Sequence, residues 1–263
     1  MASIRILSAG GETLVSARGD GSVWLLYERE YALGDRVEFE SDGQRALASA
    51  DACIAPARLY LPRKRFVYAI PDAGEPREPF GPGAFAGSRH LLALRPDVES
   101  GFRNLALNPL DQTGETDAYP HVSANAETRG ESVFRARNVV DGGHANTSHG
   151  VWPFQTWGVD NDEDARLTLD FGREVIVHTA VLVLRADFPH DAYWTSASLT
   201  LSDGSKQVLR LQKTAEPQTF PLGGRRIRSL TLGDLVKSDD PSPFPALRQL
   251  EVYGVDAEAS EVF

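Results

Sequence analysis

Two stretches in the C-terminal half of the chain gather side chains that could hold a saccharide. Aromatic rings stack on the apolar C–H faces of sugars, while planar or bidentate polar groups hold the hydroxyls. The first stretch follows residue 142, and the second follows an apolar run that ends at residue 184. The candidate ligand-binding residues are His144, Asn146, His149, Trp152 and Trp157 in the first stretch, then Arg185, Asp187, His190, Asp191 and Trp194 in the second. We expect the two stretches to form loops around one site.

Some side chains of the same region could also transfer protons. The catalytic candidates are His121, His190, Tyr119 and Arg129. In a lyase or an epimerase, Tyr119 or a histidine would exchange a proton next to a carboxylate that Arg129 or Arg185 neutralises. A glycoside hydrolase would need a pair of carboxylates, for which Asp187 and Asp191 are candidates. Zinc held by His144 and His149, together with His121 or Asp191, is a weaker hypothesis, since their spacing in a loop is not a known zinc signature.

The elements that must position these residues are strands. Short apolar runs separated by Gly, Asp and Pro fill residues 1–98, and Val23-Trp-Leu-Leu-Tyr27 is an example. Residues 99 to about 163 are polar but rich in aromatic residues, which favours ordered loops over disorder. Alternating patterns return at 166–171 and 198–202, and the β-branched run at 175–184 suits a strand buried on both faces. We expect no helix longer than a turn or two after residue 164.

The predicted fold class is therefore all-β, with two β-sandwich domains. The 263 residues are enough for two domains of ordinary size. The N-terminal sandwich is expected to cover residues 1–98, a connecting loop region residues 99–128, and the C-terminal sandwich residues 129–263.

The C-terminal half also resembles a known family in a series of short motifs. The turn Asn138-Val-Val-Asp-Gly142 resembles the N-x-x-D-G turn that opens discoidin domains, and the segments 167–172, 199–204 and 250–254 follow in the expected order. These motifs make the C-terminal half similar to the discoidin, or coagulation-factor type C, domains, which include many bacterial carbohydrate-binding modules. The resemblance implies a galactose-binding-like jelly roll. The segment 185–191 departs from ordinary modules and looks like a distinct branch of two-domain bacterial proteins.

The resemblance further implies a structural calcium ion, because related domains commonly tie this turn to the acidic residue of the last strand. The matching positions are the Asn138 carbonyl, the Asp141 carboxylate, a carbonyl at or near Gly143, and Glu251. Calcium needs six to eight oxygen ligands, which a turn of this kind supplies. The alternative is that Asp141 only caps the turn and Glu251 pairs with an arginine. Arginine, histidine and aromatic residues in the nearby loops resemble the galactose-binding arrangement of related modules.

Charge and composition exclude several classes of partner. The net charge of −10 argues against nucleic acid and against an anionic membrane surface, which both attract basic proteins. No run approaches the roughly 20 apolar residues of a membrane helix, and the first residues do not resemble a signal peptide. The single cysteine, Cys53, cannot form an internal disulfide. We therefore expect a cytoplasmic protein in which Cys53 is a small buried hydrophobic residue.

These observations favour a carbohydrate-binding protein that recognises a saccharide through loops of a β-sandwich, without catalysis. One alternative is a carbohydrate-active enzyme, a lyase or a glycoside hydrolase, that uses the same His, Arg and Asp residues. Another is an interaction subunit of a larger complex. A binding module usually accompanies a catalytic domain, so a partner enzyme or a second copy of the chain is an expected partner besides the saccharide.

Overall fold

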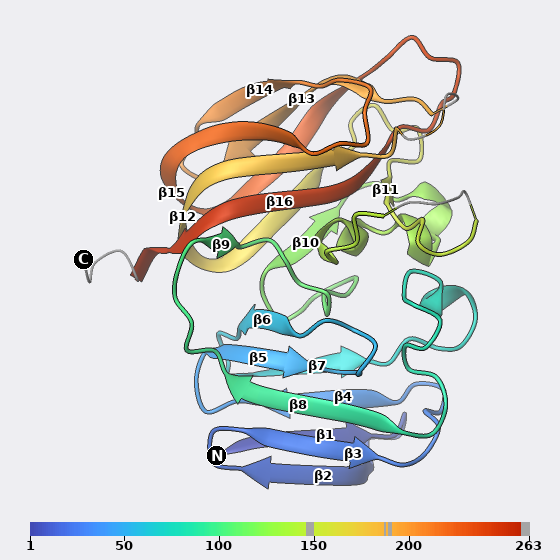
Figure 1. The fold of residues 1–263 in the computed structure, drawn as a ribbon, viewed down its shortest axis with the longest axis vertical. Helices are drawn as coiled ribbons and strands as arrows, with labels where there is room; N and C mark the ends of the chain where they lie inside the picture. The colour runs from blue at the N-terminus through green and yellow to red at the C-terminus, as the bar shows by residue number, and fades with distance from the viewer. Residues whose placement is uncertain (146–149, 187, 189–190, 259–263) are drawn as a thin grey trace.

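The computed structural model describes residues 1–145, 150–186, 188 and 191–258. Within these residues the regular structure is almost entirely β-strand, and the chain forms two sandwiches, one above the other in Figure 1. The helices of this described part are short 3-10 turns: η1 (Glu75–Arg77), η2 (Thr128–Gly130), η3 (Ser132–Phe134) and η4 (Ala136–Val140). None of them is long and apolar enough to cross a membrane. The prediction of an all-β fold with two sandwiches is confirmed.

The N-terminal sandwich consists of two four-stranded antiparallel sheets with the orders β2-β1-β4-β7 and β3-β8-β5-β6. Its strands are β1 (Ala2–Leu7), β2 (Thr13–Gly19), β3 (Val23–Tyr27), β4 (Arg36–Glu40), β5 (Arg45–Ser49), β6 (Ala57–Tyr60), β7 (Arg65–Ala69) and β8 (His90–Pro96). Strand alternation sends Ile4, Phe39 and Leu92 into one shared core. Leu110 and Ala118 join this core, so part of the predicted connecting region packs with the N-terminal sandwich.

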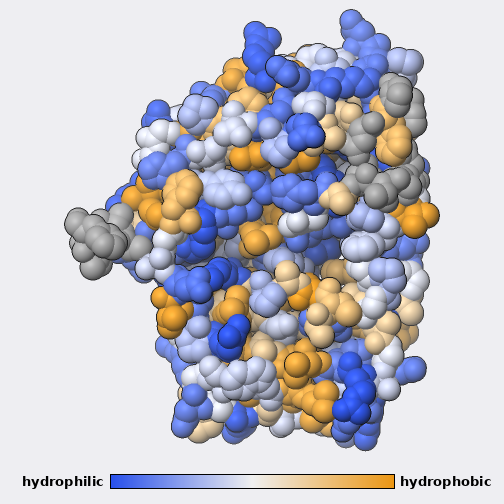
Figure 2. Space-filling view, viewed as in Figure 1, coloured by the Kyte–Doolittle hydropathy of each residue, from blue (hydrophilic) through white to orange (hydrophobic). Residues whose placement is uncertain are grey.

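The outer face of the sheet that begins with β3 is partly apolar. Leu26 of β3 lies opposite Leu91 of β8, and Trp24 stands on the same face. All three side chains are exposed to solvent. Figure 2 shows hydrophobic residues gathered over this side of the N-terminal sandwich. The alternation in β3 therefore buries one apolar row and leaves a second at the surface.

The C-terminal sandwich is formed by one hydrogen-bonded sheet with the order β11-β16-β12-β15-β13-β14, to which β9 and β10 are added. Its strands are β9 (Arg103–Asn104), β10 (His121–Ala124), β11 (Trp157–Gly158), β12 (Leu167–Leu184), β13 (Trp194–Leu201), β14 (Lys206–Arg210), β15 (Gln218–Lys237) and β16 (Ala246–Asp256). In Figure 1 the long strands β12, β15 and β16 curl across the upper half of the molecule. Their inward side chains, such as Phe171, Val177 and Leu250, form a second core.

Strand β12 joins two segments that the sequence pattern separates. The predicted strands 166–171 and 175–184 belong to one strand, and its register with β15 shifts between Asp170 and Val175. Irregularities of this kind let a strand bend from one layer to the next. Gly172 at the bend has a φ of 68°, and a Cβ atom there would lie 2.4 Å from the Tyr119 ring. Only glycine fits this position.

A cluster of charges fixes the two sandwiches together. The carboxylate of Asp256 in β16, which is 1% exposed, pairs with Arg45 of β5 at 2.8 Å, Arg103 of β9 at 2.7 Å and Arg173 of β12 at 2.6 Å. Burial raises the pKa of Asp256, but the nearby guanidinium groups outweigh this effect and hold the pKa below its usual value. We call these four residues the Asp256 cluster.

Candidate functional site

A cavity of about 420 Å³ lies at the loop end of the C-terminal sandwich, where β12 ends. It is lined by His144, Val183, Leu184, Arg185, Ala215, Glu216, Pro217 and Arg248. His144 comes from the first stretch of predicted ligand residues and Arg185 from the second. The structure therefore brings one residue of each stretch to the same cavity, which we call the loop cavity.

Backbone carbonyls orient the basic side chains of the loop cavity. The guanidinium of Arg248 is 1% exposed and donates to the carbonyls of Ala145, at 2.9 Å, and Gln155. Arg185 is also buried, and its Nη1 donates to the carbonyl of Phe154 at 3.3 Å. These bonds orient two planar guanidinium groups at one wall of the cavity.

The imidazole of His144 lies at the exposed end of the loop cavity. Its Nε2 lies 2.9 Å from a carboxylate oxygen of Glu251 in β16. A histidine thus pairs with Glu251, where the alternative to calcium assumed an arginine. Glu251 is held next to the cavity by this contact.

The donors around the N-x-x-D-G turn do not fit a calcium ion. The Asp141 carboxylate accepts N–H bonds from Gly143 (2.7 Å), Gln249 (2.7 Å) and Gln155 (2.9 Å). The Asn138 carbonyl accepts a further bond from Gln249 at 2.9 Å. Calcium would have to compete with amide N–H groups that these oxygens already accept. Among the described residues, no group of three or more His, Cys, Asp and Glu side chains could hold a metal.

The structure corrects the prediction for two tryptophans. Trp157 is completely buried, Trp194 is 2% exposed, and their ring centroids lie 6.2 Å apart inside the C-terminal core. The indole N–H of Trp157 donates to the carbonyl of Ala126 at 2.9 Å. Neither ring offers a face to a ligand. Residue type alone predicted a binding role, but the core of the sandwich needs large apolar side chains as well.

The remaining ligand candidates lie in different places. Trp152 is 42% exposed, and its ring lies against Gly81 of the N-terminal half, outside the lining of the loop cavity. Asp191 is buried, and its carboxylate accepts the N–H of Phe188 at 3.1 Å, which closes a turn. Four further candidates lie outside the described residues, namely Asn146, His149, Asp187 and His190.

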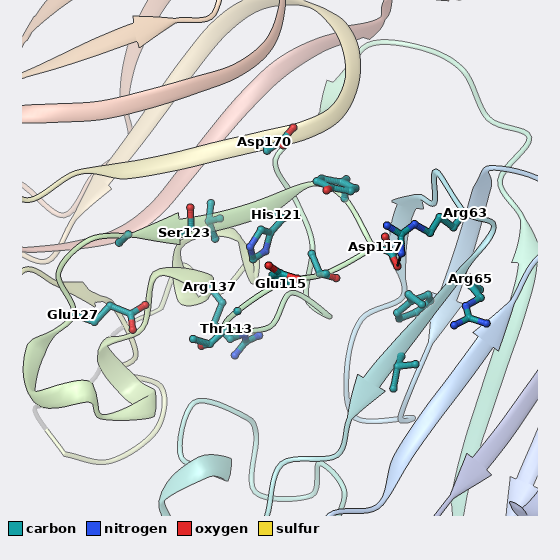
Figure 3. A pocket seen from close by; sticks show the side chains of 17 residues that line it. Arg63, Arg65, Thr113, Glu115, Asp117, His121, Ser123, Glu127, Arg137 and Asp170 are labelled. Carbon is teal, nitrogen blue, oxygen red and sulfur yellow. Dashed lines mark hydrogen bonds and ion pairs between the residues drawn. The ribbon is translucent and has the colours of Figure 1, made fainter. Parts of the chain in front are cut away.

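A second cavity, of about 830 Å³, lies between the two sandwiches (Figure 3). We call it the interdomain cleft. The N-terminal sandwich contributes Arg63, Arg65, Phe66 and Val67, and the C-terminal sandwich contributes β10 and Asp170 of β12. The loop 113–117 forms a third part of the wall. Of the catalytic candidates, Tyr119 and His121 line this cleft.

A buried carboxylate orients His121 at the cleft. The Nδ1 atom of His121 lies 2.7 Å from Oδ1 of Asp111, whose other oxygen accepts the backbone N–H of Val122 at 2.9 Å. Burial lowers the pKa of His121, but the bond to Asp111 and the charges of Asp111 and Asp170 outweigh it and raise the pKa above its usual value. Burial raises the pKa of Asp111, and His121 and Arg137 only partly oppose this.

Arg129 does not meet the other catalytic candidates. It is exposed and forms a bidentate pair with Glu131, with N···O distances of 2.6 and 2.8 Å. Neither Arg129 nor Arg185 lines the interdomain cleft. In the described residues, neither arginine thus lies beside Tyr119 or His121 in the cleft, whereas Arg185 shares the loop cavity with another histidine, His144, and the candidate His190 lies outside the described residues.

Sequence reasoning missed Asp111 and Arg248. Asp111 lies in an irregular polar segment, where no periodicity shows which side chains turn inward. Arg248 lies between Leu247 and Gln249 in β16, and an arginine inside a strand that is otherwise largely apolar is the one sequence signal that pointed to it. Its burial depends on the carbonyls of Ala145 and Gln155, which are distant in sequence.

Comparisons with solved structures identify similar β-sandwiches. A chitosan-binding module of a chitosanase/glucanase from Paenibacillus sp. IK-5 is 19% identical, with a TM-score of 0.39, covering 58% of this chain and 99% of the module. A family 32 carbohydrate-binding module from C. perfringens, solved with galactose, is 13% identical, with a TM-score of 0.38, covering 50% and 91%. A Streptococcus pneumoniae fucose binding module is 15% identical, with a TM-score of 0.39, covering 57% and 97%. No family model and no curated protein matches the chain.

Proposed function

We propose that the chain is a carbohydrate-binding protein and that the loop cavity of its C-terminal sandwich recognises a saccharide. The observation that carries the proposal is the convergence of His144 and Arg185 on one cavity, with Arg248 beside them. The volume of about 420 Å³ lies in the range of small-ligand sites. We infer that one or two sugar rings are the ligand.

The chemistry of the lining supports hydroxyl groups as the ligand's polar atoms. A planar guanidinium can donate two parallel hydrogen bonds, which suits neighbouring hydroxyls of a sugar. Glu216 and the imidazole of His144 can accept hydrogen bonds from the same ligand. Backbone carbonyls hold Arg185 and Arg248 in place, so little side-chain entropy is lost on binding.

We propose recognition without turnover. Glycoside hydrolysis uses two carboxyl groups on either side of the scissile bond. Among the described residues that line the loop cavity, Glu216 is the only carboxylate. Incubation with oligosaccharides followed by chromatography should therefore yield no shortened product of hydrolysis.

The test is a glycan array followed by calorimetric titration of the best ligand. Replacing Arg185 with methionine keeps the apolar part of the side chain and removes the donors. A hydrogen bond to a charged group is worth about 1.5–3 kcal/mol, so Arg185→Met should weaken binding roughly 10- to 150-fold. The matched control is Arg210→Met, which changes an exposed arginine of β14 and should leave affinity unchanged.

Two results would contradict the proposal. One is an array on which no glycan is bound by the wild-type chain. The other is a titration in which Arg185→Met and Arg210→Met bind equally well, provided that circular dichroism shows both variants folded. Size-exclusion chromatography of the same samples will show whether a second copy of the chain is a partner.

A further inference from the structure

The interdomain cleft has the features of a second binding site. Its volume of about 830 Å³ lies within the range of ligand sites, and its walls come from both sandwiches. Figure 3 shows His121 between the loop that carries Glu115 and the strand that carries Asp170, with Arg63 and Arg65 on the opposite side. The Asp256 cluster holds the two walls together, so the cleft exists without a ligand.

One ring nitrogen of His121 is available to a ligand in this cleft. The Nδ1 atom is used by Asp111 at 2.7 Å, and the Asp111 side chain is fully buried. The imidazole therefore has a fixed orientation, and Nε2 is its other hydrogen-bonding atom. The His121 side chain is 15% exposed and lines the cleft, which places this atom where a ligand could reach it.

The buried pair is costly for a purely structural element. Removing a carboxylate and an imidazolium from water costs several kcal/mol per ion, and apolar residues of similar size often stabilise a fold equally well. A third buried ion stands behind the pair, because Arg137 donates to the carbonyls of Asp111, at 2.7 Å, and Pro109. Oriented ionisable groups at the wall of a cavity are typical of functional sites.

The charges of the cleft indicate the class of ligand. Its lining contains the basic residues Arg63, Arg65 and Arg137 and the acidic residues Glu115, Asp117, Glu127 and Asp170. Arg63 already pairs with Asp117 at 3.4 Å. A phosphate or sulfate would need an excess of positive charge, which this wall lacks. Hydroxyl groups both donate and accept hydrogen bonds, and so they fit a wall that carries donors and acceptors together.

We propose that the interdomain cleft binds an uncharged saccharide, with Nε2 of His121 hydrogen-bonded to one of its hydroxyl groups. Asp111 acts through His121 as a positioning residue. This site is separate from the loop cavity, since the two linings share no residue. The chain would then hold saccharide units at two places, one in the C-terminal sandwich and one between the sandwiches.

The test uses the full chain with ¹³C-labelled histidine and follows the imidazole signals by NMR during titration with galactose, L-fucose and the neutral trimer N,N′,N″-triacetylchitotriose. His121 reports on the cleft, His144 on the loop cavity, and the exposed His178 on neither. We expect the His121 signal to shift and to saturate with at least one sugar, while the His178 signal stays in place. In calorimetry, His121→Gln should weaken the cleft site about tenfold, and the matched control His178→Gln should not.

The outcomes separate this proposal from the function proposed above. Shifts at His144 without shifts at His121 overturn the proposed cleft site and remain consistent with saccharide binding in the loop cavity. Shifts at neither histidine overturn the cleft site and count against saccharide binding altogether. A His121 shift combined with unchanged affinity in a folded His121→Gln variant overturns the role of Nε2.

Discussion

Replacing Asp256 with asparagine removes one charge at the junction of the two sandwiches and keeps the shape of the side chain. The carboxylate is 1% exposed, whereas its partners Arg173, Arg103 and Arg45 are 13%, 20% and 27% exposed. Breaking a fully buried ion pair costs about 3–5 kcal/mol, because the remaining charge stays buried. Since two of the three arginines can reach water, we take the lower end and expect a loss of about 3 kcal/mol.

Chemical denaturation measures this loss directly, and thermal unfolding should show a fall in Tm of roughly 6–12 °C. The control is Glu174→Gln, which neutralises a half-exposed partner of Arg226 and should change little. The pKa of Asp256 is lowered in the fold, so its contribution is present above the unfolded value of about 3.9 and is lost as the pH falls through the folded value. A loss below about 1 kcal/mol would refute the assignment of the cluster as a stabilising link between the domains.

Three further predictions concern individual residues. The pKa of His121 is raised in the fold, so its contribution to stability is complete below about pH 6.5 and is lost as the pH rises through the pKa of the folded state. The Tm of His121→Gln should therefore differ from that of the wild type more at about pH 5.5 than at about pH 8.5. Gly172→Ala should lower the free energy of unfolding by about 1–3 kcal/mol, because residue 172 has a positive φ and the added Cβ would collide with the Tyr119 ring. An unchanged denaturation midpoint would contradict the role given to Gly172 in the bend of β12. Calcium chloride or a chelator should leave the Tm unchanged, because both oxygens of Asp141 already accept N–H bonds. A rise in Tm with calcium would restore the metal hypothesis.

The strands could be predicted from sequence because their signal is local. Alternation in Val23–Tyr27 appears in the structure as alternating buried and exposed side chains. The bend of β12 could not be predicted, since Gly172 and its neighbours resemble an ordinary turn between two strands. Residue 172 lies at a bend because the Tyr119 ring packs against it, and Tyr119 is far from Gly172 in the sequence.

The site was predicted only where residue type and loop position were sufficient. His144 and Arg185 follow recognisable turns and strands, and the structure brings both to the loop cavity. The burial of Trp157 could not be inferred, because an aromatic ring suits a core and a binding surface equally. The pairing of Asp111 with His121 is a tertiary contact between a loop and the first residue of β10, and no spacing in the sequence predicts it.

The last strand, β16, has a consequence for how the protein is made. It pairs with β9, β11 and β12, provides Arg248 to the loop cavity and Gln249 to the turn, and ends in the carboxylate that Arg45 requires. Arg45 leaves the ribosome long before Asp256 is translated. A nascent chain that lacks β16 can fold its first sandwich, but it has neither the Arg248 guanidinium of the loop cavity nor the carboxylate that pairs with Arg45, so the loop cavity is completed only after β16 has been translated.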